Sequence, residues 1–371
     1  MKRLLLLFAA CAALLCGCVS RQLEDELLVI VLGVDAEGEE TVLTVKVPSA
    51  ASASQKDESG GYLLYSARGR GFAGALSMLR AAAPRKLNFT QVREIVLGKE
   101  AASGPLLPLL TQIDAVPRLR CSAALIVCTE SAKAMIDAQK PDLGVRLSRY
   151  TDSTLADSAG KGFTPDADLC GVLRDLRGGQ TDPLLILGAM SAEKAPDAPE
   201  GPSALDALPG DLPRQGAGNI ELFGAAATDG ERVAGYLTGY DMALIHLIQG
   251  NIRFFPFTAA SGALLRITAR APARLTADLT RTPARFTVAL ACDAHCPPGA
   301  LEDPDALAAA LQGEIRDVLV RLQSLGCDAL GFSAAAAGQF LTLEAWEGRG
   351  LSSAYADAEI EVRLSVRCLE Q

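Results

Sequence analysis

Histidine and the short motifs that mark common enzymes are scarce or absent in this sequence. The chain of 371 residues contains two histidines, His246 and His295, which limits histidine-based catalysis and metal binding to very few sites. Walker A, G-x-S-x-G and HExxH patterns are missing, so the sequence marks no phosphate-binding loop, nucleophile elbow or zinc-peptidase helix. A Ser-His-Asp triad without a local signature stays open.

Positive charge is also in short supply. Lys and Arg number 35 against 44 Asp and Glu, a formal net charge of −9, and this acidic balance argues against a nucleic-acid partner. The residues are 49% hydrophobic and 21% charged, which excludes disorder as the dominant state. The length predicts two domains or three and is enough to bury a core without disulfide staples.

Long apolar runs are absent except at the N-terminus, where Leu4 to Leu15 follows two basic residues. This run is too short to span a bilayer and fits a secretory signal. Its ending, Leu15-Cys16-Gly17-Cys18, resembles a bacterial lipobox, whose cysteine is lipidated and becomes the new N-terminus. We therefore predict a lipoprotein signal peptide over residues 1–17 and a two-chain lipid anchor at Cys18, which attaches a chain stably to a membrane. The alternative is an ordinary cleaved signal with an incidental cysteine.

Loss of residues 1–17 removes Lys2 and Arg3, leaving 33 basic against 44 acidic residues and a net charge of −11. Seven cysteines remain beyond Cys18, an odd number that cannot pair completely. Cys121 and Cys128 would lie about 23 Å apart in one strand, too far to bond with each other. We interpret most of the seven as small buried hydrophobic residues, and their disulfide state stays open: Cys121, Cys128, Cys170, Cys292, Cys296, Cys327 and Cys368.

Hydrophobic patterning mixes hairpins with strand–helix units. Residues 27–32 form an apolar run, and residues 41–47 alternate with Leu43, Val45 and Val47 on one face, which predicts a hairpin. Further strands are expected over residues 62–67, 92–97, 121–128, 220–226 and 231–237, and helices over residues 72–83, 106–113 and 131–138, the last capped by Ser131. The fold class is therefore predicted to be α+β, with mixed or antiparallel sheets and packed helices in two to three domains.

Residues 195–218 are rich in Pro and Gly and read as a linker. We expect an N-terminal α+β domain over residues 18–194 and a C-terminal α+β domain over residues 219–371. In the second, a helix over residues 304–325 begins with Asp303 as cap and Pro304. The final strand alternates apolar and charged residues, which predicts a one-sided antiparallel sheet covered by that helix.

Two short patterns suggest chemistry. Residues 69–74 match G-x-G-x-x-G, but the acidic partner of a dinucleotide site is poorly placed, because Glu94 lies inside a strand and Glu100 comes late. We interpret the glycines as a strand-to-helix turn. Cys292, His295 and Cys296 offer three metal ligands, but a structural zinc site needs a fourth. His246 or Cys327 could supply it only if the fold brings one of them close. A thiol pair in a loop is the preferred interpretation, with neither metal nor cofactor.

The order of the predicted segments along the chain also resembles that of a known family. The predicted lipobox is followed by residues 21–25, a strand ending in Gly33-Val34-Asp35, and Leu43-Thr44-Val45. This order resembles the spore germination C-subunit lipoproteins, the Ger(x)C family, over nearly the whole mature chain. The resemblance continues through Ala67–Gly69 with Ala75, Pro84–Leu87, Ile95–Glu100, Phe223-Gly224, Val233–Leu237, Gln323–Asp328, Gly331-Phe332, Trp346 and the final strand.

The resemblance implies a non-enzymatic subunit of a germinant receptor on the outer face of the spore inner membrane. Its implied partners are a polytopic A-type subunit and a transporter-like B-type subunit, and its role is that of a scaffold or coupling element. No ligand-binding residue carries over, so Cys18 is the single residue with a predicted role, in lipid attachment. The alternatives are a free-standing extracytoplasmic solute-binding lipoprotein and an extracytoplasmic enzyme with an unmarked active site.

Overall fold

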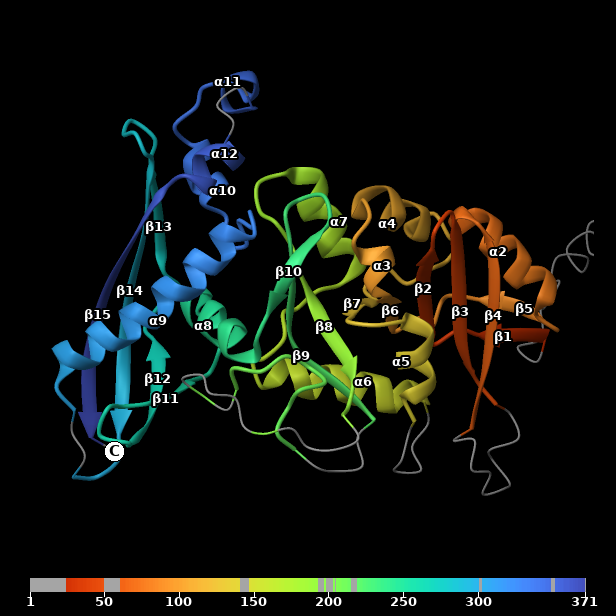
Figure 1. Cartoon of the computed structure of the whole chain (residues 1–371), viewed down its shortest axis with the longest axis horizontal. Coiled ribbons are helices and arrows are strands. Elements are labelled where there is room, and N and C mark those ends of the chain that lie inside the picture. Colours follow the sequence, from red (N-terminus) through yellow and green to blue (C-terminus); the bar gives the residue numbers. More distant parts are fainter. Residues whose placement is uncertain are drawn as a thin grey trace, which may run out of the picture.

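Two large β-sheets, each with its own hydrophobic core, follow one another along the long axis of the molecule (Figure 1). The structure is a computed structural model, and it describes residues 25–49, 61–140, 147–192, 197, 203, 205–214, 219–299, 302–347 and 351–370. Helices and mixed sheets occur in both parts, so the predicted α+β class is confirmed.

The first sheet has eight strands, with a parallel centre and antiparallel pairs at both ends. The central strands are apolar and almost wholly buried, as expected for parallel strands covered on both faces. The hairpin predicted near residues 41–47 is formed by the second and third strands of the chain. The strand order is β10 (Val233–Leu237), β9 (Ile220–Thr228), β8 (Leu184–Met190), β7 (Ala124–Cys128), β6 (Glu94–Leu97), β2 (Val31–Glu37), β3 (Glu40–Pro48) and β4 (Tyr62–Arg70).

Short helices connect these strands, and a separate two-stranded parallel sheet lies at the end of the molecule remote from the second large sheet (Figure 1). That small sheet pairs β1 (Glu26–Leu28) with β5 (Lys86–Asn88). The predicted Ser131 cap is present, with its hydroxyl accepting from Ala134 N. The helices are α2 (Gly71–Ala82), α3 (Lys99–Ala102), α4 (Leu106–Asp114), α5 (Ala132–Ala138), α6 (Leu147–Gly160) and α7 (Leu169–Gly178).

The second large sheet contains β11 (Phe255–Thr258), β12 (Leu264–Ala269), β13 (Arg274–Asp278), β14 (Arg285–Cys296) and β15 (Glu359–Glu370), with α9 (Pro304–Ser324) packed on β15. As predicted, Asp303 caps α9 and Pro304 begins it. The expectation of a purely antiparallel sheet is corrected, because β15 runs parallel to β14 along its full length. The chain between β14 and β15 includes α9, and such a crossover returns the chain in the same direction. The remaining helices here are α10 (Phe332–Ala337), α11 (Leu343–Glu347) and α12 (Leu351–Ala356).

The interpretation of residues 292–296 as a loop thiol pair is also corrected, since they form the end of β14. Cys292 and Cys296 are both fully buried and lie on the same face of the strand. Four residues of strand separate their Cα atoms by about 13 Å, which is too far for a disulfide. His295 lies on the opposite face, with Nε2 3.3 Å from the hydroxyl of Thr268.

The predicted linker does not coincide with the division between the sheets. The strands β9 and β10 follow it in sequence, yet β9 pairs with β8 and thus extends the first sheet. Part of the expected linker is packed, since Leu205 O and Ala207 O accept from the first residues of the buried helix α8 (Gly239–Gln249). The apolar strand β9 pairs with β8, whose backbone N–H and C=O groups would otherwise be unpaired at the edge of the sheet. The Pro and Gly content of the preceding segment does not reveal this pairing.

Two aspartates link the part of the chain before β8 to the segment that follows α9. Asp328 N donates to Asp182 Oδ2 at 2.7 Å, and Asp182 N donates to Asp328 O at 3.1 Å. The Asp328 carboxylate accepts from the backbone N–H groups of residues 331–333 at 2.7–3.0 Å. Burial, with the nearby Asp328 and Asp229 charges, raises the pKa of Asp182 to about 6.

The Asp182→Asn variant is therefore expected to gain stability over the parent as pH rises. A raised folded-state pKa favours folding below pH 4 and disfavours it once Asp182 ionises above pH 6. Asparagine keeps an acceptor for Asp328 N without that charge. Between pH 4 and pH 7.5 the unfolding free energy of the variant, relative to that of the parent, should rise by about 1–2 kcal/mol. This is less than the full pKa shift implies, because Asp182 is partly exposed to solvent. Urea unfolding at both pH values, with the exposed Asp114→Asn as control, measures this; a pH-independent difference contradicts it.

Candidate functional site

The one residue to which the sequence gives a role, Cys18, lies outside the described residues, together with the predicted signal peptide over residues 1–17. Within the described part of the chain, no helix combines the length and apolarity needed to cross a membrane. The other patterns that suggest chemistry can be placed.

The G-x-G-x-x-G segment is the turn from β4 into α2, as interpreted from the sequence. Gly71 begins the helix with φ +65°, and a Cβ at Gly69 would collide with Ala75 N. Glu94 is buried in β6, where its carboxylate accepts from Gln139 Nε2 at 3.0 and 3.2 Å, and burial raises its pKa to about 7. Glu100 is exposed on α3. The glycines therefore allow close packing of strand and helix.

The candidate metal ligands do not come together. Among the described residues, no group of three or more His, Cys, Asp or Glu side chains is arranged to hold a metal ion. His246 is buried in α8, with Nε2 3.0 Å from Thr164 O, and burial lowers its pKa. Cys327 is buried beyond the end of α9.

Two of the seven cysteines are joined. Cys121 and Cys170 form a disulfide with a Cα–Cα distance of 5.3 Å, which links the turn before β7 to α7. Burial raises the pKa of Cys128 to about 11 and that of Cys292 to about 12. These thiols stay protonated at neutral pH, as expected of cysteines that pack as small apolar side chains.

The candidate site is a pocket of about 840 Å³ built on the small sheet of β1 and β5. Its wall combines the C-terminal part of α2, the segment 83–89 and the loop after α4. β5 pairs with β1 in the register Glu26↔Lys86. Two residues that are 60 positions apart in the sequence therefore lie side by side in the floor of the pocket. The lining residues are Glu26, Arg80, Ala83, Pro84, Arg85, Lys86, Leu87, Asn88, Phe89, Pro117 and Arg118.

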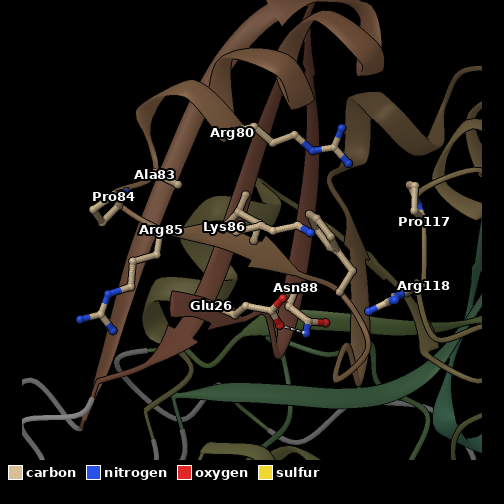
Figure 2. Close-up of a pocket in the computed structure, with 11 residues that line it drawn as sticks. Glu26, Arg80, Ala83, Pro84, Arg85, Lys86, Asn88, Pro117 and Arg118 are labelled. Carbon is tan, nitrogen blue, oxygen red and sulfur yellow. Dashed lines mark hydrogen bonds between the residues drawn. The ribbon is translucent and has the colours of Figure 1, made fainter. Parts of the chain in front are cut away.

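Positive charge dominates this pocket. Arg80, Lys86 and Arg118, here called the cationic trio, reach into the same space from α2, β5 and the loop after α4, whereas Arg85 points away (Figure 2). Ion pairs within 4.0 Å are found for many arginines of the described chain, but for none of these four cations. The one carboxylate of the wall, Glu26, accepts from Asn88 Nδ2.

The backbone at Arg118 is unusual. Its φ of +63° is the only positive value at a non-glycine position among the described residues, and left-handed backbone is uncommon for a long side chain. It lies just beyond Pro117, four residues after the end of α4. The side chain of Arg118 points toward the pocket (Figure 2).

The arrangement is suited to holding an anion rather than to transforming one. Arginine and lysine present several N–H donors to phosphate or carboxylate oxygens, and Leu87 and Phe89 supply an apolar floor. The sequence prediction missed this site. Its signal was the spacing of Arg80, Arg85 and Lys86 around Pro84, but the contribution of Arg118 depends on a fold contact that no local pattern shows.

Comparison with known proteins connects the fold to a family. Residues 20–188 match the family model for the spore germination protein N-terminal domain, which confirms the resemblance inferred from the sequence. The crystal structure of the GerBC protein has a similar fold, with a TM-score of 0.50 over 91% of this chain and 96% of that chain, at 12% sequence identity. No curated protein matches the chain by sequence.

Proposed function

Because the N-terminal half of this chain belongs to the spore germination protein N-terminal domain family, we propose that the protein is a lipid-anchored, non-enzymatic C-type subunit of a spore germinant receptor. The match over residues 20–188 carries the proposal. The fold shared with the GerBC protein along nearly the whole length of both chains supports it.

The proposed place of the protein is the outer face of the spore inner membrane. The lipobox-like sequence ending at Cys18 would anchor a body that otherwise consists of packed sheets and helices. Its partners would be the polytopic A-type and transporter-like B-type subunits of the same receptor. In that complex the chain would act as a scaffold or coupling element for nutrient-triggered germination.

Deletion of the gene tests this function. Spores without the protein are expected to form in normal numbers but to lose or slow germination with one class of nutrient, and a wild-type copy should restore the response. The measurement is the fall in optical density after each nutrient is added separately. Unchanged germination with every nutrient, together with lost uptake of a solute by growing cells, would instead favour the free-standing solute-binding lipoprotein.

A further inference from the structure

We propose that the pocket on β1 and β5 binds the phosphate of an anionic lipid headgroup in the membrane to which the chain is tethered. This inference rests on the lipid anchor proposed at Cys18. It deepens the proposed function by assigning a membrane-facing side to the protein.

The pocket is positively charged, whereas the protein as a whole is negatively charged. The whole chain has a net charge of −9, yet three cations and one carboxylate face the space of the pocket, since Arg85 points away (Figure 2). An acidic body near an anionic bilayer is repelled, so a local basic surface decides which side approaches. The cationic trio converges from three structural elements, α2, β5 and the loop after α4 (Figure 2), which matches the several oxygens of one phosphate group.

The position of the pocket also favours the membrane. Glu26 is part of the wall, and it follows Cys18 by eight residues. Eight residues span at most about 29 Å when fully extended. The pocket is therefore confined near the bilayer surface, while the second large sheet lies at the opposite end of the molecule (Figure 1).

Tethering explains why a lipid is favoured over a free anion. A short tether raises the effective concentration of headgroups at the pocket into the millimolar range or above. Each cation near an anionic surface strengthens binding roughly five-fold, and such contacts weaken with salt. Individually weak contacts of this kind suffice to orient a body that the anchor already holds.

Vesicle binding by the predicted mature chain, residues 18–371 with Cys18→Ala, tests the pocket without the anchor. Vesicles of phosphatidylcholine, with and without phosphatidylglycerol, are sedimented with the protein at low and high salt. We expect binding only to the anionic vesicles, and less of it at high salt. The triple variant Arg80→Gln, Lys86→Gln, Arg118→Gln should bind roughly 100-fold more weakly, at roughly five-fold for each cation lost.

Matched variants separate the pocket from net charge. Arg253→Gln, Arg274→Gln and Arg316→Gln remove the same three charges from exposed positions around the second large sheet, and this triple variant should retain the binding. Glu26→Gln keeps an acceptor for Asn88 and should bind roughly five-fold more tightly. Thermal unfolding establishes that each variant is folded; if the pocket triple variant is not, Glu26→Gln and the salt dependence decide.

Three outcomes would overturn the proposal. They are equal binding to neutral vesicles, equal loss of binding in the control triple variant, and binding of inorganic phosphate in the pocket without any preference for anionic vesicles. The last would identify a site for a soluble anion. Because the assay omits the lipid anchor and the spore, its failure would leave the proposed anchor and receptor role intact.

Discussion

Replacement of Cys18 by alanine is expected to move the protein from the membrane fraction to the soluble fraction of sporulating cells. Two acyl chains hold a protein on a bilayer because each buried methylene contributes about 0.8 kcal/mol. The described residues contain no helix able to take over that role. Fractionation followed by immunoblotting measures the redistribution, and nutrient germination of the same spores should fall to the level of the deletion strain.

The wash conditions in this experiment matter, because the basic pocket provides a second, weaker attraction to the membrane. A salt wash screens exposed charges and should release the Cys18→Ala protein while leaving the lipidated parent in place. Cys11→Ala, which changes a cysteine inside the apolar run, is the matched control and should behave as the parent does. Membrane retention of Cys18→Ala after the salt wash, with normal germination, would contradict the anchor.

Local signals predicted local structure well. Asp303, Pro304 and the apolar stripe of the following residues define a helix that the structure contains with the same cap and start. Ser131 likewise caps α5. Sheet membership was not predictable in the same way, because the pairing of β9 with β8 joins strands on either side of a Pro-rich segment. Strand pairing is decided by open edges and burial, which are properties of the assembled fold.

The alternation of apolar and polar residues along a strand gives a wrong prediction of burial where both faces of the sheet are covered. Lys46 lies between apolar residues of β3, a position that the pattern assigns to the polar face. It is fully buried, donates to Ile136 O at 2.7 Å and to Gln139 O, and lies 3.8 Å from the centre of the Tyr62 ring. Burial lowers its pKa to about 8. The partners come from α5 and β4, so no short window of sequence contains them.

The site shows the same division between local and distant information. Arg80 and Lys86 are six residues apart in the sequence, but Arg118 joins them only because the loop after α4 lines the same pocket as β5. The anchor is predicted from four consecutive residues, Leu15 to Cys18, which the chain alone displays. A pocket lined by three separate stretches of the chain is not displayed in this way.

Asp35 illustrates how a distant contact completes a local motif. It lies two residues before the end of β2 and is 8% exposed. Its carboxylate accepts from Ala132 N at 2.7 Å, Lys133 N at 3.0 Å and Ser131 Oγ at 3.2 Å. These are donors at the start of α5, where an anion also interacts favourably with the helix dipole. A Cβ at Gly98 would collide with the Asp35 carboxylate, so glycine there makes room for it.

Asp35→Ala is therefore expected to lower the free energy of unfolding by about 3 kcal/mol. The change leaves the buried Ala132 N–H without an acceptor, and an unsatisfied buried donor costs about 1–3 kcal/mol in addition to the lost charged hydrogen bonds. Asp35→Asn keeps one acceptor and should lose about half as much. Denaturant unfolding of the mature chain measures both, with Asp114→Ala, an exposed change at the end of α4, expected within about 0.5 kcal/mol of the parent. Equal effects of Asp35→Ala and Asp114→Ala would show that the start of α5 is held by packing alone, with the carboxylate contributing nothing.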